Sequence, residues 1–362
     1  MLKTNKLDKF FKALLPTPFT IAVLLTFLTF ILALIFTKPQ SEGNYLLQLV
    51  SYWEKGIWHT PLLEFAIQMM LMLVLGHALA LSSPISKIIT KGLRYCTNTS
   101  RAAAIVTFFT VLVSLFNWGL GLIFGAIFAR KVGEYASKNN IKINYPLIGA
   151  AGYSGLMAWH GGISGSAPIK IAEEGHFLED KIGVISQSET IFSLMNINIS
   201  IVLLVALPLL MYYLGSKNPG KNVSISSKTQ EEKKQIAGAE KLDHSYILAS
   251  IFGGLIILYA FYKALILPET ISLSVINPNY INFVLLGLAI LMHKNFYKFL
   301  KSIDRAIIGA SGILIQFPLY FGIMGIINYS GMVEIMSSFF VSISNETTFP
   351  IFTFFSAGIV NV

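Results

Sequence analysis

Residues 144–176 read NYPLIGAAGYSGLMAWHGGISGSAPIKIAEEGH. The stretch begins like an apolar membrane helix, but three glycines and a proline interrupt it between positions 161 and 168. Glycine and proline at this density do not continue an α-helix. Inside a bilayer, unwound backbone survives only where protein encloses it or water reaches it, because its N–H and C=O groups need partners. The sequence therefore predicts a broken helix over residues 144–173, with the break lining a polar cavity.

The break carries polar side chains as well as glycines. His160, Ser164 and Ser166 are crowded onto it. In membrane carriers, a discontinuous helix of this kind offers the positive end of a half-helix and unpaired amides to an anion or a coupled ion. A second reading is a kink that only lets helices pack closely. The crowding of polar groups favours a binding site.

The composition places the chain among membrane proteins. Apolar residues make up 54% of it and charged residues only 12%, against about 25% charged in an ordinary soluble domain. The net charge of +9 comes from Lys and Arg in short loops between apolar runs. That pattern indicates membrane topology and not a nucleic-acid surface. With a single cysteine, Cys96, we expect an all-α polytopic membrane protein without disulfides, metal or nucleic-acid partner.

The N-terminus carries four lysines between positions 3 and 12, followed by an apolar run at 19–36. The run is too long for a signal peptide, and no small-residue cleavage site follows it. We therefore expect a retained first span with a cytoplasmic N-terminus.

Apolar runs and basic loops divide the chain into five parts. We expect an N-terminal span and interfacial loop at 1–60, a first repeat at 61–214, a cytoplasmic linker at 215–245, connecting spans at 246–305 and the start of a second repeat at 306–362. The first repeat is expected to contain a scaffold helix at 61–81, a hairpin at 102–129, the broken helix at 144–173 and a span at 191–214. Later spans are expected at 246–267, 281–292, 306–329 and 349–362, with an external loop at 330–348.

The hairpin is predicted from the charges that flank an apolar run. Residues 102–129 are apolar, yet Arg101 precedes them and Arg130 follows them. A single span would place one basic end outside the cell, whereas a re-entrant hairpin keeps both ends in the cytoplasm. We favour the hairpin, with its tip at Asn117–Gly119.

An internal repeat supports the same plan. Three matches lie at nearly the same separation: Phe65–Gln68 with Ile313–Gln316, Thr107–Phe109 with Thr353–Phe355, and Asn117 with Asn361. The two copies are expected to have opposite topologies, which is the inverted-repeat plan of many carriers. The second copy has far fewer residues than the first, so we expect it to be truncated at its C-terminus.

Several short motifs in the first repeat are more specific than this general pattern. They are Asn117–Gly121 (NWGLG), Phe124–Ala126 (FGA), Tyr145–Leu147 (YPL), Ala150–Gly155 (AAGYSG), Trp159–Ser166 (WHGGISGS), Ser188–Phe192 (SETIF) and Asn196. Together they resemble the short-chain fatty acid transporter family over essentially the whole chain. Members of that family continue beyond the segment that resembles Ser356–Asn361 into a Ser/Gly-rich stretch, which agrees with the expected truncation.

The resemblance implies a function and a mechanism. The family is grouped with the ion-transporter superfamily, whose members use inverted repeats, re-entrant hairpins and an elevator-like motion. It implies secondary active uptake of short acids such as butyrate or acetoacetate, coupled to H⁺ or Na⁺, across the bacterial inner membrane. A homodimer is expected by analogy only, and no cofactor is expected.

A short fatty acid needs donors for its carboxylate and a small apolar pocket for its tail. The substrate-binding candidates are Asn117, Trp118, Gly119, Trp159, His160, Gly161, Gly162, Ser164, Gly165 and Ser166. The coupling-ion or supporting candidates are Ser188, Glu189, Thr190, Asn196 and Asn361.

The sequence allows two roles for each of three of these residues. His160 either carries a proton or fixes its neighbours as a neutral ring. Asn117 either binds substrate or caps a helix, and Glu189 is either a surface acid or an ion ligand.

The function also has alternatives. One is a carrier for a dicarboxylate or hydroxy acid, and another is an incomplete, non-transporting membrane subunit. An intramembrane enzyme using His160 with Ser164 or Ser166 is disfavoured, because the sequence has no G-x-S-x-G elbow and no acid placed to orient the histidine. We expect no catalytic residues.

Overall fold

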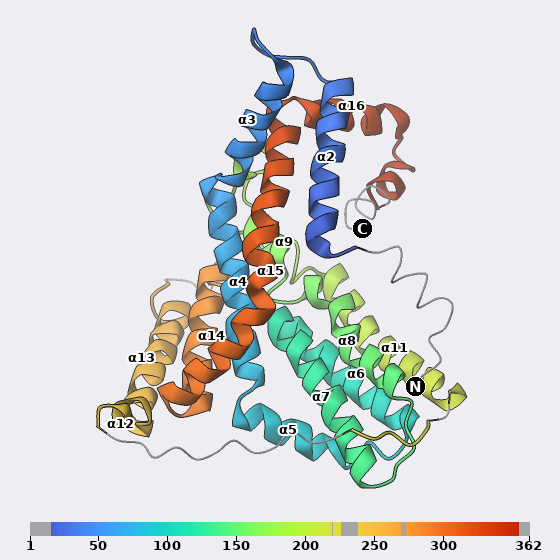
Figure 1. Ribbon diagram of the computed structural model, residues 1–362, viewed down its shortest axis with the longest axis vertical. Helices are drawn as coiled ribbons and strands as arrows, with labels where there is room; N and C mark the ends of the chain where they lie inside the picture. Colours follow the sequence, from blue (N-terminus) through green and yellow to red (C-terminus); the bar gives the residue numbers. More distant parts are fainter. Residues whose placement is uncertain (1–15, 219, 226–237, 269–272, 355–362) are drawn as a thin grey trace. The chain divides into compact units, whose positions relative to one another are not determined.

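The computed structural model describes residues 16–218, 220–225, 238–268 and 273–354 (Figure 1). Over these residues the chain is helical, and the described part contains an isolated bridge between Ile143 and Lys221 but no strand. Six described helices are long and apolar enough to cross a membrane: α2 (Pro18–Phe36), α4 (Thr60–Ala80), α6 (Thr99–Phe116), α11 (Leu194–Lys217), α13 (Tyr246–Leu265) and α15 (Phe296–Tyr329). The prediction of an all-α polytopic membrane protein is confirmed.

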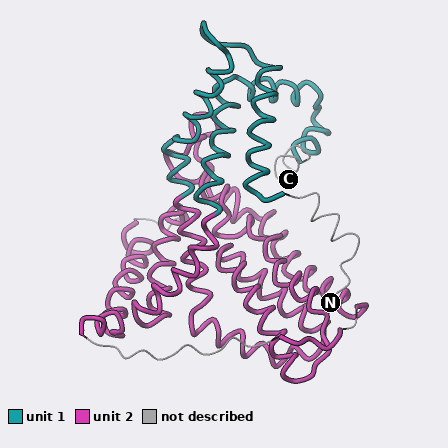
Figure 2. Tube along the Cα trace, viewed as in Figure 1, with its two compact units in different colours: residues 1–66, 312–362 teal, residues 67–311 magenta. Residues whose placement is uncertain are grey.

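The chain divides into two compact units, residues 1–66 with 312–362 and residues 67–311 (Figure 2). The divisions fall within α4 and within α15. The first unit contains α2, the start of α4, the end of α15, and the shorter helices α3 (Tyr45–Ile57) and α16 (Met332–Ile343). Its core joins Ala33, Leu49, Ile326 and Met332.

The second unit contains the hairpin and the broken helix. Its remaining elements are α5 (Ser83–Leu93), α7 (Trp118–Lys138), α8 (Tyr145–Tyr153), η1 (Ser154–Met157), η2 (Trp159–Gly161), α9 (Ser166–Ile171), α10 (Glu179–Ile182), α12 (Glu240–Asp243), η3 (Leu273–Val275) and α14 (Pro278–His293). Helices α6, α7, α8 and α11 form one group, and α13 and α14 pair beside it (Figure 1).

The group around α6 packs through small residues. A Cβ on Gly125 of α7 would lie 1.9 Å from the carbonyl oxygen of Gly152 of α8. A Cβ on Gly121 would lie 2.1 Å from Ser114 Oγ of α6. Backbones can approach this closely only where the side chain is a hydrogen atom. Larger side chains, including Val106, Phe124 and Phe128, then fill the buried core that extends along these helices.

Three segments differ from the expected outline. The expected interfacial loop forms α3 from Tyr45, because Asn44 Oδ1 accepts from the N–H of Leu46 at 2.9 Å and caps the helix. The expected external loop at 330–348 contains α16. Helix α15 begins at Phe296, ahead of the expected 306, because Asn295 Oδ1 caps its first turn at Lys298 N.

Some expectations lie outside the described residues. They are the basic tail at 3–12, part of the linker at 226–237, the end of the last span at 355–362 and, within it, Asn361. Membrane topology and the division into repeats stay predictions.

Replacing Gly125 by alanine tests the packing of α7 on α8. The new methyl group meets rigid backbone, so we expect the free energy of unfolding to fall by about 1–3 kcal/mol. The control is Gly149→Ala in α8, where a Cβ would meet nothing within 4 Å. That change should be neutral or stabilising by about 0.5–1 kcal/mol. Unfolding in detergent measures both, and equal losses would contradict the packing account.

Candidate functional site

Asn117 forms the turn of the hairpin. Its backbone is extended (φ −150°, ψ 124°) and separates α6 from α7. Its N–H donates to the carbonyl of Val113 at 2.9 Å, and its Oδ1 accepts from the N–H of Leu120 at 2.7 Å. Asn117 therefore ends α6 and starts α7. It supplies a hydrogen-bond partner to one carbonyl at the end of α6 and to one N–H at the start of α7.

The broken segment lacks α-helix from Ser154 to Gly165. Helix α8 ends at Tyr153, the two short 3₁₀ turns η1 and η2 follow, and α9 begins at Ser166. At Gly162 the backbone is extended (φ −90°, ψ 173°). The interruption thus lies where the glycines of the sequence indicated it.

The tip and the break hydrogen-bond to one another. The N–H of Ile163 donates to the carbonyl of Leu115, near the end of α6, at 2.8 Å. The N–H of Trp118, the first residue of α7, donates to Ser164 Oγ at 2.9 Å. Both bonds satisfy groups that helix ends leave open. Ser164, which is fully buried, therefore acts as a cap supplied by another segment.

This contact requires glycine. A Cβ on Gly162 would lie 2.3 Å from the carbonyl oxygen of Leu115, and one on Gly165 would lie 2.2 Å from the carbonyl oxygen of His160. A Cβ on Gly119 would lie 2.8 Å from Leu73 Cα of α4. Because these residues are glycines, the break can approach the end of α6, and the start of α7 can approach α4.

Two N–H donors at the tip have no partner. Asn117 Nδ2 and Trp118 Nε1 are buried without a hydrogen bond among the described residues. A buried donor left unsatisfied costs about 1–3 kcal/mol. Such donors need a hydrogen-bond acceptor, which a ligand or a water molecule can supply.

Three hydroxyls on α6 continue this pattern. The side-chain oxygens of Thr107, Thr110 and Ser114 are buried and unpartnered within the described chain. With Asn117 they form a polar stripe at helical spacing in an otherwise apolar helix. The sequence analysis missed these three, although that spacing is a signal that could have found them.

Aromatic rings cover the same region. The rings of Trp118 and Trp159 lie 5.5 Å apart, and those of Trp159 and His160 lie 3.6 Å apart, between centroids. His160 is exposed. Ser166 is half-buried at the start of α9.

Asn196 joins the break to α11. Its Nδ2 donates to the carbonyl of Gly161 at 2.9 Å and to that of Ile191 at 2.7 Å. Thr190 Oγ1 is buried without a partner among the described residues. Ser188 and Glu189 are exposed, and no hydrogen bond or ion pair between them and the break is found among the described residues. The structure thus brings Asn196 to the break and leaves these two apart from it.

A groove of about 290 Å³ lies beside the break. Its walls are mainly apolar, with Leu115, Phe116, Ile191 and Leu204 among them, and Asn196 and Ser200 add polar groups. Its volume is close to the lower end of small-ligand sites, roughly 300 Å³.

Among the described residues, the site offers neutral donors, and its buried cation is paired with an acid. Lys170 of α9 is buried, but its Nζ lies 2.5 Å from Glu173 Oε2, so the pair is neutral. The sequence analysis missed this pair, which the i,i+3 spacing could have indicated. No group of three or more His, Cys, Asp or Glu that could hold a metal occurs among the described residues. Hydroxyl and N–H groups of this kind suit a small anion.

Replacing Ser164 by alanine tests the bond between tip and break. Without Oγ, the N–H of Trp118 loses its acceptor, so both segments should open more often. We expect faster amide hydrogen exchange in peptides covering 115–120 and 160–166. The control is Ser154→Ala, whose hydroxyl bonds only locally, to the carbonyl of Ala151. Unchanged exchange at the tip in Ser164→Ala would contradict the contact.

Comparison with known proteins assigns the chain to a family. The family model described as "Short chain fatty acid transporter" matches residues 3–362. Two relatives bear that family's name. The one from Escherichia coli (strain K12) is 35% identical over 363 residues, which is 98% of this chain and 79% of the relative. The one from Haemophilus influenzae is 33% identical over 365 residues, 96% of this chain and 77% of the relative.

No solved structure matches the chain. The family match covers the hairpin, the break and α11, which together carry the motifs of the site. With its apolar helices, the chain is a multi-pass membrane protein. It belongs to the short-chain fatty acid transporter family.

Proposed function

We propose that the protein is a secondary active transporter that takes up short-chain fatty acids such as butyrate or acetoacetate. Uptake across the bacterial inner membrane would be coupled to H⁺ or Na⁺ and proceed by an elevator motion, in a homodimer. One observation carries the substrate assignment. Asn117 Nδ2 and Trp118 Nε1 are buried and unpartnered where the tip meets the break.

A carboxylate completes this arrangement. Its oxygens accept from Asn117 Nδ2 and Trp118 Nε1, which removes the cost of two unsatisfied donors. Trp118 also begins α7, a helix of 21 residues whose positive end favours an anion. The apolar groove beside Gly162 offers room for a short tail.

The neutrality of the site favours a monocarboxylate over a dicarboxylate. The one buried cation near the break, among the described residues, is Lys170, and Glu173 compensates it. A second carboxylate would therefore enter without a counter-charge and lose its hydration. A carrier for dicarboxylates is thus the weaker proposal. The transporter family likewise supports a carrier over an enzyme.

The coupling ion has two sets of candidate groups. A proton would use His160, which lies in the break with its ring 3.6 Å from that of Trp159, between centroids. A sodium ion would use side-chain oxygens such as Thr190 Oγ1, which is buried and unpartnered among the described residues, and Asn196 Oδ1.

Uptake of labelled butyrate into proteoliposomes, with H⁺ and Na⁺ gradients imposed separately, tests the function. We expect accumulation with one of the two gradients and none without a gradient. Succinate should be taken up poorly, because its second charge finds no partner. The absence of uptake for every short-chain acid tested would contradict the proposal, and a preference for succinate would support the alternative.

Asn117→Ser separates substrate binding from helix capping. Serine also caps helices well, but it lacks the second amide donor. Loss of one hydrogen bond to a charged group should raise the KM for butyrate roughly 10- to 100-fold. The control is Asn98→Ser, which alters the exposed cap of α6 and should transport normally. An unchanged KM in Asn117→Ser would show that the Asn117 amide does not bind the substrate.

His160→Ala tests whether His160 carries the coupled proton. If His160 carries the coupled proton, wild-type uptake rises as the external pH falls, and the variant loses this dependence. Uptake should be measured between pH 5 and 8, which spans roughly the range where histidine titrates. An identical pH profile in the variant would give His160 a structural role.

A further inference from the structure

A second cavity lies in the unit of residues 67–311, away from the break. It has a volume of about 800 Å³ and is lined by α5, the end of α14 and the start of α15. Five lysines and one arginine line it, and no Asp or Glu does among the described residues: Lys87, Lys91, Lys294, Lys298, Lys301 and Arg305. We call it the basic cavity. None of its lining residues belongs to the proposed substrate site.

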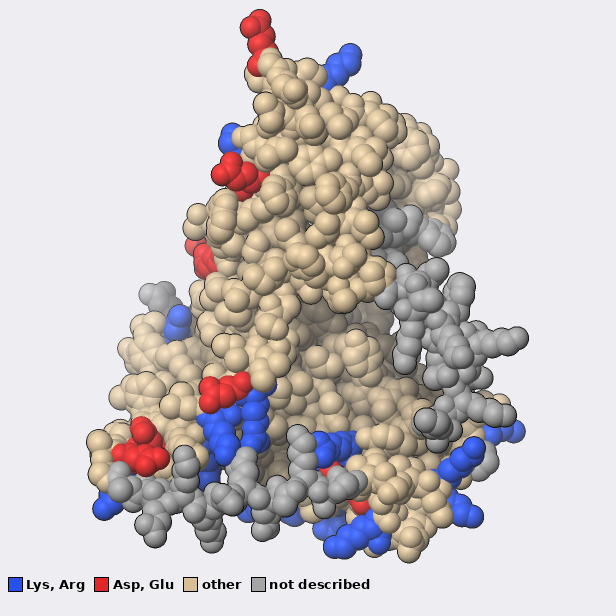
Figure 3. All heavy atoms as spheres, viewed as in Figure 1, with Lys and Arg blue, Asp and Glu red and all other residues tan. Residues whose placement is uncertain are grey.

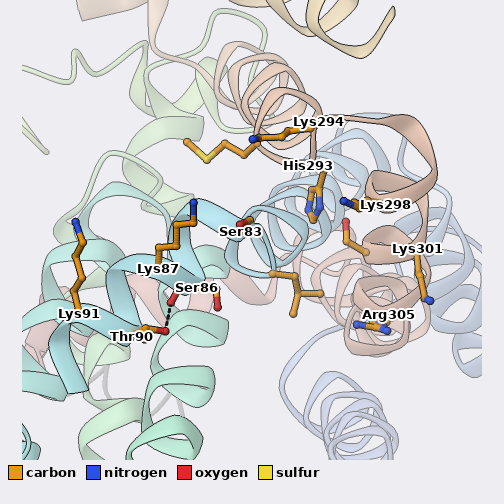
Figure 4. A pocket seen from close by; sticks show the side chains of 13 residues that line it. Ser83, Ser86, Lys87, Thr90, Lys91, His293, Lys294, Lys298, Lys301 and Arg305 are labelled. Atoms are coloured by element: carbon orange, nitrogen blue, oxygen red, sulfur yellow. Dashed lines mark hydrogen bonds between the residues drawn. The ribbon is translucent and has the colours of Figure 1, made fainter. Parts of the chain in front are cut away.

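The basic side chains come from two helix faces. On α5, Ser83, Lys87 and Lys91 follow one another at four-residue spacing. On the other side, Lys294 ends α14, and Lys298 and Lys301 lie in the first turns of α15. Figure 4 shows the side chains that line the cavity, those of α5 on one side and those of the end of α14 and the start of α15 on the other. In Figure 3, Lys and Arg side chains gather along the lower edge of this unit, with acidic side chains among them.

The positions of Lys87 and Lys91 on α5 and of Lys298 on α15 are electrostatically unfavourable. Lysines three or four residues apart on a helix repel one another. Basic residues in the first turn of a helix also oppose its dipole, whose positive end lies there. Lys298 is in that position in α15, since its N–H is bonded by the cap Asn295. An anion in the cavity offsets the repulsion between the lysines, and it interacts favourably with the positive end of α15.

The backbone conformation of Lys294 also indicates a function for the basic cavity. Lys294 ends α14 in the left-handed conformation (φ 67°), where helices usually have glycine. A lysine there is strained, and a strained residue beside a cavity suggests a function for its side chain. The left-handed turn carries the Lys294 side chain to the cavity wall.

The location indicates the source of the anion. Leu81, which lines the cavity, directly follows the apolar span α4, and Met292 lies at the end of apolar α14. The cavity therefore lies at the level where apolar helices leave the bilayer and lipid headgroups lie. Clusters of Lys and Arg next to membrane spans bind anionic headgroups.

We propose that the basic cavity binds a phosphate group, supplied by the headgroup of an anionic phospholipid. Lysine ammonium groups bind the phosphate oxygens, as they do in other phosphate sites. The Ser83 hydroxyl adds a neutral donor, and Leu81 and Met292 contact the apolar part of the lipid.

Thermal unfolding of the full chain in neutral detergent tests this inference, because a ligand of the folded state raises the midpoint. The additions are phosphatidylglycerol, phosphatidylcholine with the same acyl chains, and sodium phosphate against sodium chloride at equal ionic strength. Phosphatidylglycerol should raise the midpoint by several degrees, and phosphatidylcholine should have little effect. An equal shift with phosphatidylcholine would overturn recognition of an anion. An equal shift with phosphate alone would overturn the phospholipid as the source.

Variants locate the site. Lys87→Gln with Lys298→Gln removes one charge from each wall and should abolish most of the shift. The matched control, Lys138→Gln with Lys217→Gln, removes two exposed charges outside the cavity and should keep it. A full shift in the cavity variant would overturn the proposal.

Lys294→Gly provides a test that does not depend on a destabilised variant. Glycine fits the left-handed turn, so without lipid this variant should unfold at a higher midpoint than the wild type. Its shift with phosphatidylglycerol should be smaller, because one ammonium group is lost. A wild-type shift in Lys294→Gly would contradict a role for Lys294.

Discussion

Backbone that leaves a helix inside a membrane must find hydrogen-bond partners in the protein. In this chain they come from the ends of a neighbouring helical hairpin. The N–H of Ile163 bonds to the carbonyl of Leu115, and Ser164 Oγ accepts from the N–H of Trp118. Each bond completes a group that a helix terminus leaves open. The tip and the break therefore stabilise one another, and the other features of the site depend on their contact.

Close packing encloses the polar groups around this contact. Gly119, Gly162 and Gly165 let backbones approach at distances that exclude any side chain. The remaining polar groups are then enclosed, and Asn117 Nδ2 and Trp118 Nε1 have no partner among the described residues. Burying such donors costs stability, so a ligand that accepts from them would stabilise the tip. We propose that a small carboxylate restores the missing bonds, with the positive end of α7 offsetting its charge.

The sequence predicted the membrane class and the broken helix, because composition and Gly/Pro density are local properties. It did not predict that Ser164 caps a helix 46 residues away, since local patterns carry no information on such pairs. It also did not predict that the Asn196 amide bonds to the break at Gly161; a role for Asn196 near a coupled ion stays a prediction. The basic cavity was hidden because its two lysine clusters are far apart in sequence and each alone indicates only topology.

The chain uncoils between Ser154 and Gly165 and contacts the hairpin tip at Leu115 and Trp118, and we propose that an acid binds there. An electron cryomicroscopy map of the protein in lipid nanodiscs with butyrate tests it most directly. We expect an interrupted helix and ligand density within hydrogen-bond distance of Asn117 Nδ2. A continuous helix from Pro146 to Ala172, with Ser164 facing lipid, would contradict it.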